Sequence, residues 1–197
     1  MTTQRRIGAP DAKNRTLLLD AAEQLMLADG YAAVTSRRLA DKAGLKPQLV
    51  HYYFRTMDDL FLAMFRRRAE EGLQRQRELL ESERPLRSLW EFNTDAERTG
   101  FIMEIASLAQ HRKAIRAEVR RYSEQFRLAQ LEVVAAVMER YHIPREVCTP
   151  AALVVLMTSV ARVMSLEEKL DFSLGHKDAI DFMDRYLDQL EGFATKG

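Results

Sequence analysis

The chain has few of the residues that cross-link or interrupt a fold. Cys148 is its only cysteine, so no intramolecular disulfide can form, and a reducing cytoplasm is the expected compartment. The 197 residues include only eight glycines and five prolines, and they contain no repeat or low-complexity stretch. Charged residues alternate with apolar ones instead. These features predict a helical globular protein that is long enough for a core and a small additional module.

Several functional classes lack support in the sequence. The polar residues through Lys13 do not resemble a secretory signal, and the longest uncharged apolar stretch, residues 150–161, is too short to cross a bilayer. We therefore expect a buried helix there and no membrane association. The sequence has no glycine-rich phosphate loop, zinc-ligand spacing or nucleophile elbow. An enzyme needs such a set of groups, so we expect no catalysis, metal or cofactor.

The net charge of +1 conceals an uneven distribution of charge. Residues 1–55 carry nine Lys and Arg against five Asp and Glu, for a net charge of +4. Residues 56–197 carry 21 and 24, for a net charge of −3. A basic end on a mildly acidic body suits a protein that binds nucleic acid at one end. A solvated basic face has the same charge, so the inference depends on a motif.

Residues 35–54, TSRRLADKAGLKPQLVHYYF, have the pattern of two short helices joined by a tight turn. The Thr35 hydroxyl can cap the first helix, and Gly44 permits the left-handed conformation that ends it. Pro47 is tolerated in the first turn of the second helix, where amides have no intrahelical partner. A pair this short cannot bury a core alone. Such a pair usually presents one helix to the major groove of DNA.

Hydrophobic periodicity and capping signals predict further helices on both sides of this pair. One helix precedes it, from about residue 12 to 29, after a polar arm with Arg5 and Arg6 that is either a disordered terminus or a minor-groove contact. A capping box at residues 56–59 starts the next helix. The expected fold is all-α with about nine helices: three in an N-terminal module, residues 1–55, and six in a C-terminal bundle, residues 56–197. In the bundle, the first helix is expected at about 56–81, a short second helix begins at Pro85, and a third is capped by Thr94 and extends to about residue 109. The last three are expected at about 115–141, 150–166 and 176–190.

The residues around the helix pair resemble the TetR family of bacterial transcription regulators over about residues 11–65. Downstream of the pair, the match continues through residues 53–56 and 59–61. The chain departs from the family at His51, where Tyr is common, and at Met57, where Lys is frequent. The resemblance implies a helix-turn-helix DNA-binding module and a ligand-binding, dimerising bundle. The upstream matches are Arg15, Leu18, Leu19, Ala21, Ala22, Leu25, Met26, Gly30, Tyr31, Val34 and Thr35.

The resemblance and the helical spacing together indicate which residues bind DNA. Arg37 can be a bidentate donor to guanine, and Gln48 can pair with adenine. Leu49 can contact a thymine methyl group. A solvated side chain is the alternative for Arg37, and a place in the core is the alternative for Tyr52 and Tyr53. The expected DNA-binding residues are Ser36, Arg37, Lys46, Pro47, Gln48, Leu49, His51, Tyr52 and Arg55, whereas Leu45, Val50 and Phe54 turn inward and Tyr53 belongs to the core.

The resemblance also implies a small-molecule pocket in the bundle and a homodimer formed by the last two long helices. Residues 150–166 are apolar around most of a helix, so one face can pack within the chain and another against a partner. A monomer with a central buried helix is the alternative. Ordinary core packing, or a structural ion pair for the arginine, is the alternative to ligand binding. The expected ligand contacts are Trp90, Phe101, Met103, Tyr122, Phe126, Met157 and Arg162.

These inferences favour a cytoplasmic homodimeric repressor that a small, mostly apolar ligand releases from a palindromic operator. Its expected partners are double-stranded operator DNA, a second copy of the chain and a small-molecule effector. One alternative is a DNA-binding regulator or architectural protein without a small-molecule inducer. Another is a helical interaction protein, which leaves the basic helix pair unexplained.

Overall fold

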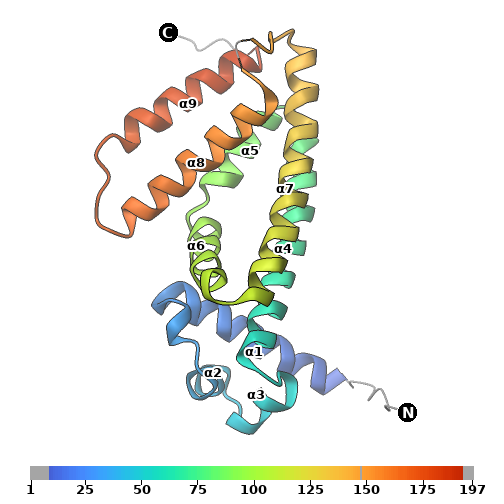
Figure 1. The fold of residues 1–197 in the computed structure, drawn as a ribbon, viewed down its shortest axis with the longest axis vertical. Coiled ribbons are helices and arrows are strands. Elements are labelled where there is room, and N and C mark those ends of the chain that lie inside the picture. The colour runs from blue at the N-terminus through green and yellow to red at the C-terminus, as the bar shows by residue number, and fades with distance from the viewer. Residues whose placement is uncertain (1–8, 147, 193–197) are drawn as a thin grey trace. The chain divides into compact units, whose positions relative to one another are not determined.

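The computed structural model describes residues 9–146 and 148–192, and every regular element within them is helical. The predicted all-α fold is confirmed, with nine α-helices and one short 3-10 helix in the described part of the chain (Figure 1). The arm with Arg5 and Arg6 lies outside the described residues. The elements are α1 (Ala9–Asp29), η1 (Tyr31–Ala33), α2 (Ser36–Ala43), α3 (Pro47–Tyr53), α4 (Met57–Leu80), α5 (Pro85–Thr94), α6 (Ala96–His111), α7 (Lys113–Arg140), α8 (Pro150–Glu168) and α9 (His176–Leu190).

The chain forms two compact units. Unit 1 comprises the residues up to Arg68 together with Glu104–Glu118, and unit 2 comprises Ala69–Met103 and the residues from Val119 onward. The helix pair α2–α3 therefore lies in unit 1, whereas α5, α8 and α9 lie in unit 2. A division of the chain at residue 55 stays a prediction.

Unit 1 contains the predicted Thr35 cap at the start of α2 and the predicted left-handed glycine at its end. The Arg38 amide donates to Oγ1 of Thr35 over 3.3 Å, and Gly44 has the left-handed angles φ 66° and ψ 30°. The predicted capping box is also present at the start of α4. The Asp59 amide donates to Oγ1 of Thr56 over 3.1 Å, and the Thr56 amide donates to Oδ2 of Asp59 over 3.0 Å. Each cap satisfies amides that the helix leaves free, which typically contributes about 1 kcal/mol.

Arg67 ties the first half of α4 to α1 within unit 1. Its Nη1 lies 2.6 Å from Oδ1 of Asp20, and its Nη2 lies 3.2 Å from Oε2 of Glu23. Arg68 contacts the same glutamate over 2.6 Å. A guanidinium that reaches two carboxylates of one helix holds α4 in a fixed orientation against α1.

Unit 2 is organised around α5, whose apolar face is buried. Leu86, Leu89 and Trp90 are at most 2 % exposed, and they share one core with residues of α7, α8 and α9. This short helix can be so completely covered because helices pack on it from several sides. The buried partners from the other helices are Val134, Val137, Met138, Leu153, Val154, Met157, Met183 and Leu187.

Two predicted features of unit 2 are wrong in detail. Thr94 does not cap α6; it is the last residue of α5, and its hydroxyl donates to the carbonyl of Trp90 over 2.9 Å. Asp95 is the cap instead, because its Oδ1 accepts the Arg98 amide over 2.7 Å. The long helix α7 ends at Arg140, before Tyr141, and His142 follows with a positive φ of 52°.

The apolar helix α8 is buried on only one face. Thr149 caps it as predicted, with its hydroxyl accepting the Ala152 amide over 3.1 Å. Within the described residues, α8 is also long and apolar enough to cross a membrane by length and composition alone, which is weak evidence by itself. Its inner face joins the core of unit 2. The outer face carries Val155, Leu156, Val163 and Leu166, each between 45 and 55 % exposed.

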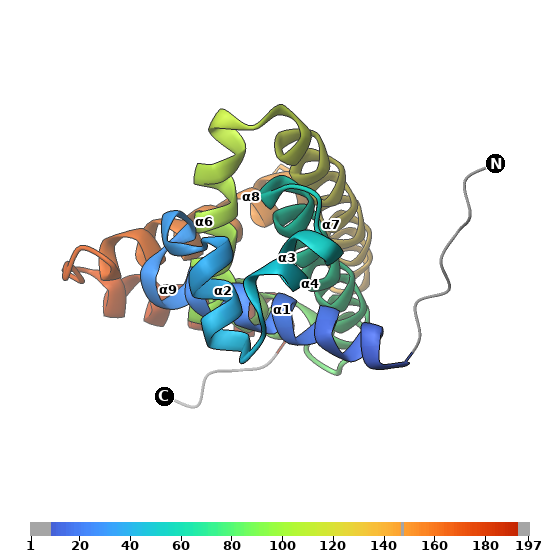
Figure 2. The same ribbon diagram turned by 90° about the horizontal axis from the view of Figure 1, so that it is seen from below.

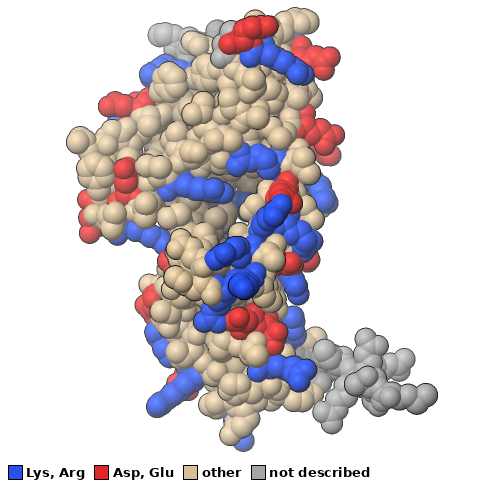
Figure 3. Space-filling view, viewed as in Figure 1, with Lys and Arg blue, Asp and Glu red and all other residues tan. Residues whose placement is uncertain are grey.

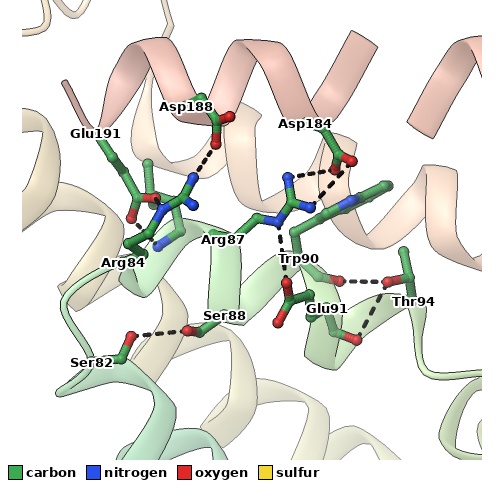
Figure 4. A network of polar contacts seen from close by, with 11 residues as sticks. Ser82, Arg84, Arg87, Ser88, Trp90, Glu91, Thr94, Asp184, Asp188 and Glu191 are labelled. Carbon is green, nitrogen blue, oxygen red and sulfur yellow. Dashed lines mark hydrogen bonds and ion pairs between the residues drawn. The ribbon is translucent and has the colours of Figure 1, made fainter. Parts of the chain in front are cut away.

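Ion pairs connect α5 to α9 on the surface of unit 2 (Figure 4). Arg84 contacts Asp188, and Nη1 of Arg87 lies 2.8 Å from Oδ1 of Asp184. The buried Glu191 accepts the Leu86 amide over 2.7 Å, so it satisfies a free amide in the first turn of α5. Desolvation raises the pKa of Glu191, and the hydrogen bonds from the backbone and the charge of Arg84 oppose that rise only in part.

This raised pKa predicts a specific pH dependence of stability. A carboxyl group that keeps its proton to higher pH in the folded chain stabilises most at low pH, and its contribution is lost as the pH rises through the folded pKa. The free energy of unfolding of wild type, relative to Glu191→Gln, should therefore decline as the pH increases from about 4 to about 8. Urea unfolding across that range measures the difference. Asp178→Asn, at an exposed carboxylate of α9, is the control and should show no such decline. Parallel curves for wild type and Glu191→Gln would contradict the inference.

Candidate nucleic-acid interface

Helix α3 presents one polar face and one buried face. Pro47, Gln48, His51 and Tyr52 are exposed, with Tyr52 53 % exposed, whereas Val50 is 1 % exposed. Helical geometry explains the division, because the four exposed residues fall on one side of a helix with 3.6 residues per turn. The structure therefore brings four of the predicted DNA-binding residues together on one face of α3.

The predicted residues outside this face vary in their exposure. Lys46, immediately before α3, and Arg55, after it, are both exposed. Leu49 is half-buried, so it contributes only part of its surface to the exposed face. Phe54 is buried as predicted, with the guanidinium of Arg15 5.4 Å from its ring centre. Tyr53 is half-buried and lies edge-on to Tyr52.

The two arginines at the start of α2 differ in their contacts. Arg38 forms an ion pair with Asp29, so its side chain is engaged in holding α2 to the end of α1. Arg37 is exposed, and it has no hydrogen bond or ion pair with any residue in the described ranges. This contrast distinguishes adjacent residues of the same type. A free guanidinium beside α3 can reach a base edge or phosphate, whereas a paired one must first break its contact.

The first turn of α2 leaves positive potential uncompensated. No acidic side chain occurs there, and Ser36 directs its hydroxyl to Sδ of Met57 over 3.5 Å, within unit 1. Lys42, exposed in the last turn, adds a further cation that the motif analysis did not select. Figure 2 shows α2 and α3 beside α1, and Figure 3 shows Lys and Arg side chains on the α2–α3 end of unit 1. Such a surface attracts a phosphate backbone.

The predicted ligand residues lie in unit 2, with different burial. Tyr122 donates its hydroxyl to Oε1 of Glu70 over 2.9 Å, a contact that the sequence did not indicate. A depression of about 230 Å³ near residues 135–150 is lined by none of the seven predicted residues. Their role in ligand binding stays a prediction. Trp90, Phe101, Tyr122 and Met157 are buried, Met103 and Phe126 are half-buried, and Arg162 is exposed.

The fold and the exposed face of α3 define a helix-turn-helix DNA-binding protein. Residues 18–64 match the sequence model of the bacterial regulatory proteins of the tetR family. Residues 18–64 therefore form a DNA-binding domain of the type found in the tetR family of bacterial regulatory proteins. The predicted family is confirmed by this match. No curated protein matches the chain.

Solved structures of transcription regulators share the fold over most of the chain. A TetR regulator from Haloarcula marismortui has a TM-score of 0.72 at 20 % identity, covering 90 % of this chain and 98 % of its own. The fatty acid degradation regulator FadR of Bacillus halodurans has a TM-score of 0.68 at 16 % identity, with 95 and 97 % covered. The regulator FadR of Bacillus subtilis, solved with stearoyl-CoA, has a TM-score of 0.64 at 13 % identity, with 91 and 99 % covered.

The free guanidinium of Arg37 predicts a loss of sequence discrimination on substitution. Arg37→Ala should weaken binding to the preferred DNA site by about 1 to 3 kcal/mol and relax the preference at one base pair, because a bidentate contact to a base is lost. The site can be obtained by selection from random DNA and titrated at fixed salt. Arg77→Ala removes an equally exposed charge from α4 in unit 2 and should leave affinity and preference unchanged. An Arg37→Ala protein with wild-type discrimination would show that Arg37 does not read a base.

Proposed function

We propose that the chain is a cytoplasmic homodimeric repressor, released from a palindromic operator when a small, mostly apolar ligand occupies unit 2. The observation that carries the DNA-binding part is the exposed face of α3 beside the free Arg37. In this proposal Ser36, Lys46, Tyr52 and the remaining predicted residues contact the operator. Two recognition helices about 34 Å apart would read a palindrome one helical turn long.

The outer face of α8 supports the homodimer. Monomers rarely expose large apolar patches, and the segment that follows α8 adds Leu170 and Leu174, which are 70 and 84 % exposed. Phe182 of the antiparallel helix α9 is 58 % exposed and stacks on Tyr186. A second copy is the occupant we propose, because a two-fold contact lets the same apolar face cover itself and places two α3 helices on one protein.

This interface predicts that a charge on α8 separates the dimer without unfolding the subunit. Val155→Glu and Val163→Glu place a carboxylate on a side chain that is about half exposed in the single chain, so folding should survive. In the dimer the same carboxylate would be buried without a partner, and the dissociation constant should rise about tenfold or more. Light scattering measures the mass, and circular dichroism measures the retained helix.

The matched control for this substitution is Leu128→Glu. Leu128 is 66 % exposed and belongs to α7, which is not part of the proposed interface, so this variant should remain dimeric. A wild-type protein that is a folded monomer at micromolar concentration would contradict the dimer. A dimer that both α8 variants leave intact would place the interface elsewhere.

The ligand part of the proposal is supported by the composition of unit 2. Its helices bring Trp90, Phe126 and Met157 into one apolar region, to which Phe101, Met103 and Tyr122 add further predicted contacts. The Bacillus subtilis regulator with a similar fold was solved with stearoyl-CoA, a ligand with a long apolar chain. Release of the selected DNA by a small molecule tests this part. A ligand that releases DNA must bind the free form more tightly, and DNA must weaken ligand binding by the same factor.

The alternatives lead to different outcomes in the same experiment. A regulator or architectural protein without an inducer would bind DNA and ignore every ligand that stabilises unit 2. A helical interaction protein would bind no DNA selectively. Selective DNA binding that no bound ligand weakens would therefore retain the regulator and remove the inducer.

A further inference from the structure

Arg127 on α7 and Arg162 on α8 are neighbouring cations in unit 2, and neither pairs with a carboxylate of the described chain. Nη2 of Arg127 lies 3.5 Å from Oγ1 of Thr158, one turn before Arg162 on α8. Arg162 itself has no hydrogen bond or ion pair with any described residue. Although Arg162 is exposed, desolvation lowers its pKa, and the charge of Arg127 lowers it further. An anion between the two guanidinium groups would remove this repulsion.

Other arginines of unit 2 show that carboxylates are available for pairing. Arg84 and Arg87 contact carboxylates of α9, and Arg120 lies 2.8 Å from Glu124 on its own helix. Arg162, in contrast, is the only charged residue between Pro150 and Leu166. A methionine at this position would give the same apolar packing as the arginine side chain. Packing therefore does not explain why a charged group is present.

An aromatic cluster includes Phe126, the residue before Arg127 on α7. Phe126 precedes Arg127 on α7, and it packs with Phe92 at a ring-centre distance of 6.5 Å. The guanidinium of Arg98, on α6, lies 3.8 Å from the ring centre of Phe92 and 4.8 Å from that of Phe126. Phe126 is half-buried and contacts the core that contains Trp90. Phe126 therefore connects the part of α7 that carries Arg127 to the core of unit 2.

Gly72 on α4 permits this close packing. A Cβ atom at that position would lie 2.6 Å from Nη1 of Arg98 and 3.1 Å from Cζ of Phe126. A residue with a Cβ atom at position 72 would therefore require the Arg98 and Phe126 side chains to shift. Figure 3 shows Lys and Arg side chains over α7 and α8 on the face seen there. This face combines positive charge with an aromatic interior, the two properties that bind an amphiphilic acid.

We propose that Arg127 and Arg162 bind the anionic head group of the effector, and that the effector is an organic acid with an apolar body. The shared chemistry is a carboxylate or phosphate oxygen, which planar guanidinium groups bind in a bidentate manner. Thr158 positions Arg127, because its hydroxyl donates to the carbonyl of Val154 over 2.9 Å and accepts from the arginine. The apolar body lies against Phe126 and the adjoining core. This inference rests on the proposed ligand response and specifies the class of ligand.

Calorimetry with three probes of equal chain length tests the inference: decanoate, decyl phosphate and uncharged decanol. At least one acid should bind the wild-type dimer, and the stronger of the two identifies the head group. Arg162→Met and Arg127→Met should each weaken that acid about tenfold to a hundredfold, the range for losing a charged hydrogen bond, and leave decanol binding unchanged. Arg120→Met removes an exposed charge from the same α7 helix and should bind the acid like wild type.

Three outcomes would overturn the inference. The first is that neither acid binds wild type, and the second is that decanol binds as tightly as the acids. The third is that the Met variants bind the acid normally; if Arg162→Met then also dissociates the dimer, its partner is a carboxylate of the second copy. Titration of the selected DNA separates this inference from the proposed function. Acid binding that depends on both arginines but leaves DNA bound would support the anion site and refute control by this ligand class.

Discussion

The helices α2 and α3 are too short to bury a core by themselves. Unit 1 therefore depends on the neighbouring helix that covers their apolar side chains. Leu39 and Ala40 of α2 are completely buried and Val50 of α3 is 1 % exposed, because α1 packs on α2 and α2 packs on α3. The side chains on the opposite face of α3 remain exposed as a result. The packing that buries one face of α3 also fixes the orientation of its exposed face. A substitution in the small core would therefore also displace the residues on the exposed face.

The contacts of the arginines separate structural from functional roles. Arg67 holds α4 to α1, Arg38 holds α2 to Asp29, and Arg84 joins α5 to α9. Arg37 and Arg162 have no such contacts within the described residues. Charged groups at the surface of a folded chain gain little from isolated pairs, but an unpaired guanidinium keeps its full capacity to bind an external anion. Arg37 in unit 1 and Arg162 in unit 2 are thus each available to bind an external anion.

Helix α8 illustrates how far composition determines structure. Its apolar residues and the Thr149–Pro150 start predicted the helix and its cap correctly. The expectation that its other face packs against a partner stays a prediction, because that face is exposed in the single chain and apolar composition does not state which neighbour covers it. The same limit applies to the predicted ligand residues: aromatic and methionine side chains at helical spacing pack into a core whether or not a ligand also contacts them.

The sequence by itself determined the helices, the turn of the helix pair and the family, because these depend on local spacing and on residues such as Thr35 and Gly44 whose conformations are intrinsically preferred. The resemblance and helical spacing also selected Pro47, Gln48, His51 and Tyr52 of α3, which are exposed, together with Leu49, which is half-buried. Only the tertiary structure distinguished Arg37 from Arg38, identified Asp95 as the cap of α6, and brought Arg98 onto Phe126 and Arg127 beside Thr158. Most of these contacts join residues far apart in the chain, or they involve one of two adjacent residues with similar chemistry. Which residue has a partner depends on where the neighbouring helix lies.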